Sequence, residues 1–437
     1  YKIPNIFALF PIKINQNHIF LSVNTAKDNK NSKTKLGKIN TPEYVSTDIL
    51  EEKFVKCFRL LSYIQMALGS CRVHYKDRFV TSPTFYQKLY SLLCITATVI
   101  MYVFLIQNYF SKYKECLFVY YCVIAAIVVD LAVYISNIIQ VRFLNADANM
   151  SFFIKLQTMD RVMKIEHIPT FISMLRALNL VTLMIFLAMF STFFVGIIYT
   201  GDILDICLII ILNSQITFIL EIANCSNFII YFFIRLRFVN SIISNHLDPD
   251  KSKQVPAVYL RILVASKRWM RYMSAQSHDF VSCDTQIYLK EIFDGFKMLQ
   301  DVYKFQVFIF CFRLVVETLI TFEFVLFGVQ NNILQIPEII AVVTYSFLNY
   351  GTAVVLSLRY EVFFREVKET KRLSIGILMK YQEGPLREKA KRMLKMIEES
   401  PPCFSVYDMW HMDAHTSMKI FSLITSLIVT LLQFAYL

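Results

Sequence analysis

Five ionisable residues stand inside long apolar stretches of this sequence and are the residues best placed to do chemistry. They are Asp130, Glu221, Arg313, Glu317 and Glu323. An ionisable group inside a membrane is unfavourable by several kcal/mol unless it is paired or hydrated, so such groups often mark a ligand or ion site. Arg313 and Glu317 are four residues apart, a spacing that lets them pair on one face of a helix. For this pair a structural role is the simpler interpretation.

A second group of residues lies in what would be the outer halves of three apolar stretches. Glu323 of one stretch is expected near Tyr345 and Asn349 of the next, in a cavity open to the outside. Aromatic side chains give a small molecule contact area, and a few polar groups fix its orientation. We therefore predict a ligand pocket lined by Phe190, Phe194, Glu323, Phe324, Tyr345 and Asn349.

The last stretch, residues 420–437, carries a repeated polar pattern without any charge, glycine or proline. As a helix it nearly spans a hydrocarbon core of about 30 Å. At about 100° per residue, one face of roughly 80° collects Ser422, Ser426, Thr430 and Gln433, with Leu437 beside them. Such a face fits two roles. Hydroxyl groups hold neighbouring membrane helices together, and a polar stripe also suits a helix that lines a water-filled pore.

Apolar helices must position these residues. Seven stretches are long enough to cross a membrane, where an apolar segment has to satisfy its backbone internally. They are 85–107, 116–140, 176–199, 203–234, 306–329, 337–358 and 420–437. The loops after the second, fourth and sixth stretches are long and basic, which predicts a cytoplasmic N-terminus and an extracellular C-terminus. The expected fold class is an all-α membrane protein with seven transmembrane helices.

The segments between the apolar stretches define the expected domains. Residues 1–84 form a cytoplasmic N-terminal segment, and residues 85–358 form a bundle of six transmembrane helices. Within and after this bundle, residues 235–305 and 359–419 carry apolar residues at helical spacing. We expect them to extend the spans as cytoplasmic helices that pack together as an anchor. Residues 420–437 form the last helix.

Composition argues against several classes of function. The 437 residues are 56% hydrophobic, and cytoplasmic loops account for the net charge of +12 without a nucleic-acid partner. The ten cysteines have no CxxC spacing, so neither a zinc site nor a disulfide framework is indicated. His411 and His415 with Asp413 between them are a weak metal pattern without further ligands. We expect no metal, no cofactor and no enzymatic activity.

The C-terminal sequence resembles the insect gustatory receptors. The last helix of that family carries Thr-Tyr, five hydrophobic residues and Gln-Phe, and here Ser426-Leu427, residues 428–432 and Gln433-Phe434 occupy this frame. The segments FSVYDMWHMDAHTSMKIF and FRLLSYIQMALGS are also similar to the family. Ser426-Leu427 and Thr430 depart from the usual pattern. The ending LLQFAYL looks most like the divergent group of moths and butterflies that is associated with plant compounds and bitterness.

The resemblance implies a homotetrameric ligand-gated cation channel in the plasma membrane. Four copies of the last helix would line one pore, with a constriction at Thr430, Gln433, Phe434 and Leu437. An external small tastant, either a plant bitter compound or a sugar, would bind within the bundle formed by spans two to six. The partners implied are this tastant, permeant cations, the lipid bilayer and further copies of the chain.

Three other classes of membrane protein remain as alternatives. An insect odorant receptor has the same architecture with volatile ligands, but the Gln-Phe ending and the long segment before the last helix favour taste. A transporter would show an internal repeat or paired broken helices, and the sequence contains neither. A G-protein-coupled receptor has the opposite orientation.

Overall fold

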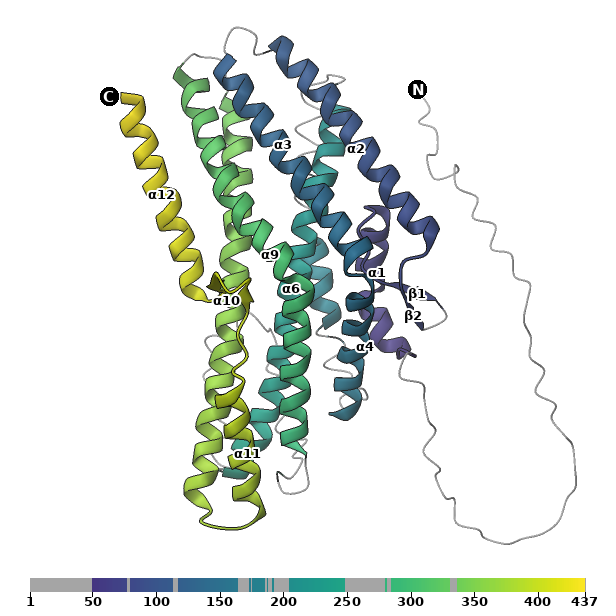
Figure 1. Cartoon of the computed structure of the whole chain (residues 1–437), viewed down its shortest axis with the longest axis vertical. Helices are drawn as coiled ribbons and strands as arrows, with labels where there is room; N and C mark the ends of the chain where they lie inside the picture. The colour runs from purple at the N-terminus through teal and green to yellow at the C-terminus, as the bar shows by residue number, and fades with distance from the viewer. Residues whose placement is uncertain are drawn as a thin grey trace, which may run out of the picture. The chain divides into compact units, whose positions relative to one another are not determined.

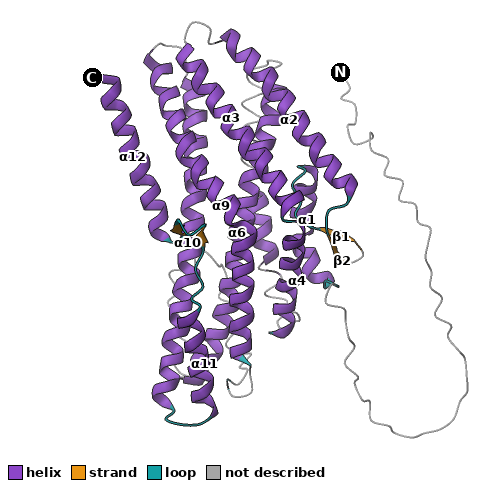
Figure 2. Cartoon of the chain, viewed as in Figure 1, coloured by secondary structure: helices purple, strands orange, loops and turns teal. Residues whose placement is uncertain are grey.

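The computed structural model describes residues 49–76, 79–112, 117–163, 175–184, 204–247, 284–330 and 336–436, with the single residues 173, 187, 191 and 280. The chain divides after Val45, and all of these residues belong to the unit Ser46–Leu437. This unit is built mostly of helices, with two short β-hairpins (Figures 1 and 2).

The described elements follow one another as a series of helices interrupted by the two hairpins. They are α1 (Glu52–Ala67), β1 (His74–Lys76), β2 (Phe79–Thr81), α2 (Phe85–Lys112), α3 (Leu117–Ile139), the π-helical turn η2 (Gln140–Leu144), α4 (Ala146–Val162), α6 (Leu204–Leu247), α9 (Thr285–Gln330), α10 (Ile336–Lys380), α11 (Pro385–Glu399), β3 (Ser405–Val406), β4 (Trp410–His411) and α12 (Ala414–Tyr436). Each hairpin is antiparallel.

Four of the described helical segments are long and apolar enough to cross a membrane. They are Phe85–Gln107, Tyr120–Leu144, Ser214–Leu247 and Ala414–Gln433, and each overlaps one of the predicted stretches. Most of the predicted stretch 176–199 lies outside the described residues, although Leu175–Met184 is a shorter apolar helix. Residues 306–329 and 337–358 form the end of α9 and the beginning of α10. The fold is therefore that of an all-α chain with apolar helices typical of a membrane protein.

The apolar helices differ in how much of their surface the chain itself covers. In α6, large side chains such as Phe228 and Tyr231 are fully buried. In α2 and α3, Phe85, Leu93 and Tyr121 are exposed. Contiguous exposed apolar surface on a folded chain marks contact with lipid or with another protein. α6 is thus the central helix, whereas α2 and α3 present faces that suit a bilayer.

The helices α6, α9 and α10 extend far beyond the thickness of a membrane. They contain 44, 46 and 45 residues, which at about 1.5 Å per residue is more than twice a hydrocarbon core of roughly 30 Å. Their ends away from the predicted outer side pack through aromatic side chains, with the rings of Phe296 and Phe363 stacked at 4.4 Å. Of the segments predicted as extensions of the spans, residues 235–247, 285–305 and 359–380 continue these helices, and residues 248–279 and 281–283 lie outside the described residues.

The turn between α10 and α11 depends on one glycine. The sequence predicts a break in the helical pattern at residues 383–385, and α10 ends at Lys380 while α11 begins at Pro385. Gly384 has φ +101°, a conformation that residues with a side chain rarely adopt. Pro385 follows in the first turn of α11, where its missing N–H group is not needed.

Candidate functional site

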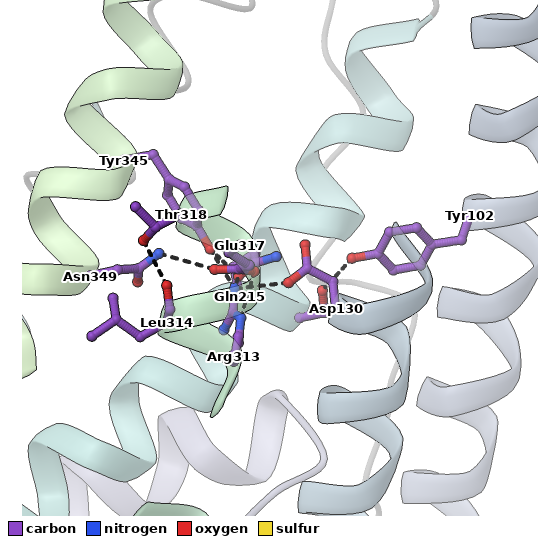
Figure 3. A network of polar contacts seen from close by, with 10 residues as sticks. Tyr102, Asp130, Gln215, Arg313, Leu314, Glu317, Thr318, Tyr345 and Asn349 are labelled. Carbon is purple, nitrogen blue, oxygen red and sulfur yellow. Dashed lines mark hydrogen bonds and ion pairs between the residues drawn. The ribbon is translucent and has the colours of Figure 1, made fainter. Parts of the chain in front are cut away.

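A cluster of polar side chains lies inside the bundle where four helices meet (Figure 3). The helices are α3, α6, α9 and α10, which bring together residues far apart in the sequence. We call the group the Arg313 cluster, and its members are Asp130, Gln215, Arg313, Glu317, Tyr345 and Asn349.

Arg313 is the centre of this cluster. Its Nε lies 2.6 Å from Glu317 Oε1, one turn along α9, which confirms the pairing predicted from the spacing. Its Nη2 lies 2.9 Å from Asp130 Oδ1 on α3. The same nitrogen donates to Gln215 Oε1 and to the hydroxyl of Tyr345. One guanidinium therefore ties three other helices to α9.

The acceptors of the Arg313 cluster are not all used. Asn349 Nδ2 donates to Glu317 Oε2 at 3.4 Å, but Asn349 Oδ1 has no hydrogen-bond partner. Asp130 Oδ1 accepts no hydrogen bond of good geometry, although it lies close to Arg313. Buried acceptors usually have a partner, so unpaired ones call for a functional or structural explanation.

Aromatic rings border the charged groups. The Arg313 guanidinium lies 5.4 Å from the centre of the Phe218 ring, within the range of a cation–π contact. Beside them, the hydroxyl groups of Tyr102 and Ser214 are 3.0 Å apart. Phe218 and Tyr102 are both buried. The site therefore combines positive and negative charge, hydroxyl groups and aromatic surface.

The structure brings together only part of the predicted ligand pocket. Tyr345 and Asn349 belong to the Arg313 cluster. Glu323 and Phe324 lie on α9 beyond Glu317, about 9–11 Å further along the helix axis. Phe190 and Phe194 lie outside the described residues. The hypothesis of one pocket formed by all six side chains remains a prediction.

Glu221, another of the ionisable residues singled out in the sequence, has a different environment. Its Oε2 lies 2.7 Å from Nε of Arg72, which belongs to the segment between α1 and β1. Its Oε1 accepts from Gln65 of α1 at 2.9 Å. Arg72 also donates to Asn149 of α4 at 2.8 Å and lies 3.9 Å from the Tyr303 ring centre. These contacts attach the N-terminal segment to the bundle, which is a structural role.

The polar face of α12 points away from the rest of the chain. Within the described residues α12 packs on α10 and α9, with Ile424 buried against them. The exposed side chains occupy an arc of about 200° around the helix axis, at roughly 100° per residue. Ser422, Ser426, Thr430 and Gln433 are all exposed and lie within this arc.

Two further residues of the predicted constriction come at the end of the sequence. Phe434 is part of α12, but its side chain is not among those described, and Leu437 lies outside the described residues. The Thr430 hydroxyl donates to Ser426 O at 2.9 Å, so it is satisfied within its own helix. The exposed face also carries apolar side chains, including Phe421 and Val429.

The base of α12 is held by a capping interaction and by a hairpin. Asp413 Oδ1 accepts from the Thr416 N–H at 2.9 Å, and the Asp413 N–H donates to Thr416 Oγ1 at 3.1 Å. Before this cap, the Trp410 ring of β4 stacks on Phe308 of α9 at 5.9 Å. Asp413 thus serves as a helix cap. Among the described residues, no group of three His, Cys, Asp or Glu side chains is placed to hold a metal ion.

Sequence reasoning missed Gln215 and Arg72, and it did not predict the partner of Asp130. Gln215 stands in an apolar stretch, and its polarity alone could have drawn attention to it. Arg72 lies in a polar segment, where nothing distinguishes it from other basic residues. Asp130 was singled out, but its partner Arg313 is 183 residues away in the sequence, and no local pattern predicts such a pairing.

No protein-family model matches this chain, and no curated protein matches its sequence.

Proposed function

We propose that this chain is a subunit of a ligand-gated, non-selective cation channel of the insect gustatory receptor type, opened by an external small tastant. A plant secondary or bitter compound is the favoured ligand, and a sugar is the other candidate. The observation that carries the proposal is the orientation of α12. Its polar stripe is the part of the helix that its own chain leaves uncovered.

An uncovered polar stripe on an apolar helix needs a partner. In lipid, the hydroxyl and amide groups of Ser422, Ser426 and Gln433 would face hydrocarbon, which is unfavourable for polar groups. A water-filled pore between four copies of α12 supplies that partner. The same stripe could also contact a helix of another subunit. The channel proposal is compatible with a pore-lining role at one depth in the membrane and a contact between subunits at another.

The finer topology belongs to the same proposal. Seven membrane spans, a cytoplasmic N-terminus and an extracellular C-terminus would place α12 with its C-terminal end at the outer side. The pore constriction would lie at Thr430, Gln433, Phe434 and Leu437. The long ends of α6, α9 and α10, together with α11, would form the cytoplasmic anchor of a homotetramer in the plasma membrane.

The ligand would bind within the helical bundle, with the Arg313 cluster as the polar part of its pocket. The cluster joins α9 and α10, and these are the helices on which α12 packs. A ligand that changes the cluster therefore acts on helices in direct contact with α12. This contiguity supports a gating role for the bundle.

The test is to substitute Gln433→Ala and to record currents from cells that express the chain. Calcium imaging against a panel of sugars and plant alkaloids first identifies an activating compound. We expect Gln433→Ala to change conductance, ion selectivity or resting leak, because an amide at the constriction contacts the permeant ion directly. Surface expression should stay normal.

Thr425→Ala is the matched control for this variant. Thr425 is also an exposed polar residue of α12, and its hydroxyl donates to Phe421 O within the helix, but it lies outside the stripe. We expect its currents to equal those of the unmodified chain. Unchanged conductance, selectivity and leak in Gln433→Ala would remove the pore assignment.

A further inference from the structure

Arg359 of α10 is a partly exposed arginine without a carboxylate partner. Its Nη1 donates to Ser226 Oγ and Asn227 Oδ1 of α6, each at 2.9 Å, and its buried Nε has no hydrogen-bond partner. Within the described part of the chain, no Asp or Glu side chain forms an ion pair with it. Arg237 of α6 differs, because it lies 2.9 Å from the Glu366 carboxylate. A guanidinium stays protonated in proteins, so the positive charge of Arg359 calls for an anion.

The hydrogen bonds around Arg359 fix the position of its guanidinium. Asn227 Nδ2 donates to Thr182 Oγ1 at 3.0 Å and to Asn179 Oδ1 at 3.2 Å. Both acceptors belong to the short apolar helix Leu175–Met184. Neutral groups of α6 therefore hold the charged side chain in place without neutralising it. A binding group that is already ordered loses little conformational freedom when its ligand arrives.

Exposed apolar surface extends from Arg359 in one direction along two helices. On α10, Val355 is 45% exposed one turn before Arg359, and a side chain at Gly351, a further turn away, would meet open space. On the short helix Leu175–Met184, Val181 and Met184 are more than half exposed. In the proposed topology these residues lie on the membrane side of Arg359. An anion attached to hydrocarbon chains matches both the charge and this surface.

The position of Arg359 along α10 fits the headgroup layer of a bilayer. The base of α12 lies beside the middle of α10 (Figure 1), where the Tyr350 and Phe421 rings are 5.7 Å apart. Phe421 stands at the start of the last apolar stretch, so Tyr350 marks the inner edge of the hydrocarbon in the proposed topology. Arg359 is nine residues further along α10, about 14 Å along the helix axis. Its side chain leans back toward the N-terminal end of α10, which brings the guanidinium to the level of lipid phosphates.

From these observations we infer that Arg359 binds the phosphate of an anionic phospholipid, whose acyl chains lie along the exposed side chains of Val355 and Val181. Arginine suits this role because its guanidinium is weakly hydrated and matches the geometry of phosphate oxygens. The inference goes beyond the proposed function and uses only its topology, which places the lipid in the cytoplasmic leaflet. Anionic lipids are concentrated in that leaflet.

The experiment measures lipid binding to the purified full-length protein in detergent by native mass spectrometry. The probes are palmitoyl-oleoyl-phosphatidylglycerol, the diacylglycerol with the same acyl chains, and glycerophosphoglycerol, which is the headgroup without chains. We expect the phospholipid to bind about tenfold more tightly than the diacylglycerol, because hydrogen bonds between charged groups are among the stronger ones. The headgroup alone should bind weakly, because it makes no contact with the apolar surface.

Two substitutions test whether Arg359 causes this preference. Arg359→Gln removes the charge and should abolish the tenfold difference between phospholipid and diacylglycerol. Arg359→Lys keeps a positive charge and should retain most of the difference, which separates loss of charge from misfolding. Arg365→Gln is the matched control, since Arg365 is an exposed arginine of the same helix that pairs with Glu361 at 2.8 Å. It should bind the phospholipid as the unmodified chain does.

Three results would overturn the inference. The first is equal binding of phospholipid and diacylglycerol, or a preference that persists unchanged in Arg359→Gln. The second is a headgroup that binds as tightly as the whole phospholipid, because the site would then take a free phosphate compound. The third is loss of the oligomer in Arg359→Gln without a change in lipid binding, because the arginine would then contact another subunit. None of these results depends on channel currents, so the proposed function is tested separately by Gln433→Ala.

Discussion

Buried charged residues in this chain occur in two different arrangements. Glu221 and Arg72 form a pair in which one negative group meets one positive group, and both are fully buried. In the Arg313 cluster, two carboxylates share one guanidinium. A matched pair holds a fold in one arrangement, because breaking it leaves an uncompensated charge in a low dielectric. In the cluster, by contrast, the guanidinium joins four helices through several partners.

The matched pair predicts a large effect of Glu221→Gln on stability. The amide keeps the shape of the carboxylate but leaves the Arg72 charge buried without its counter-ion, which costs about 3–5 kcal/mol. We expect a markedly lower melting temperature in detergent, measured by fluorescence-detected size-exclusion chromatography after heating. Adding Arg72→Met to Glu221→Gln should restore much of the stability, because it removes the unpaired charge.

A surface ion pair provides the control for Glu221→Gln. Lys391 lies 2.8 Å from Glu388 on α11 and holds the pKa of that carboxyl below its ordinary value. The pair is solvent-exposed, so it adds little to stability. Glu388→Gln should leave the melting temperature unchanged. If Glu221→Gln is as mild as Glu388→Gln, the buried pair has no structural role.

Among the elements, α12 is attached to the chain mainly at its base. The Asp413–Thr416 cap starts the helix, and Tyr350 of α10 donates to Ser417 O at 3.3 Å. Above this level the side chains on the outer arc of α12 are exposed. The hairpin before the cap packs on Phe308 of α9, five residues before Arg313. The helix that carries the cluster is thus connected to the base of α12 over a short path.

The cap predicts a local effect of Asp413→Ala. Loss of an N-cap side chain destabilises a helix by about 1 kcal/mol, which corresponds to roughly a fivefold increase in local opening. We expect hydrogen–deuterium exchange to accelerate by that factor in residues 414–420 and to remain unchanged in α9. Asp413→Asn should restore slow exchange, because asparagine caps as well as aspartate. Acceleration spread over the whole of α12 would argue against a capping role.

The periodicity and spacing of the sequence predicted local features of these elements, but not contacts between residues that are far apart in the chain. The Arg313–Glu317 pair and the break between α10 and α11 follow from residues within one or two turns of each other. The hairpins β1–β2 and β3–β4 were missed because strands of two or three residues leave no alternating pattern.

At the scale of the whole molecule, assembly depends on which apolar side chains the chain leaves uncovered. In the helices predicted to be cytoplasmic, the spacing of apolar residues predicts that Leu378, Met379, Leu394 and Ile397 form a face buried between subunits. In the structure these four side chains differ in burial. Ile397 is buried in the core of its own chain and Leu378 packs against that core, whereas Met379 is 80% exposed and Leu394 is half-buried.

Met379 and Leu394 therefore carry the last prediction, which concerns the proposed tetramer. Lipid gives helices no hydrophobic drive to associate, and a water-filled pore leaves little contact along its axis. Apolar groups in water gain about 25 cal/mol per Å² on burial, so we expect contacts between subunits in the proposed anchor to stabilise the tetramer. The double variant Met379→Asp with Leu394→Asp should give folded monomers in detergent by light scattering after size exclusion. Met379→Leu should keep the tetramer. Tetramers that persist in the double variant would place the main contacts within the membrane-spanning helices, where the exposed apolar faces of α2, α3 and α12 would have to provide them.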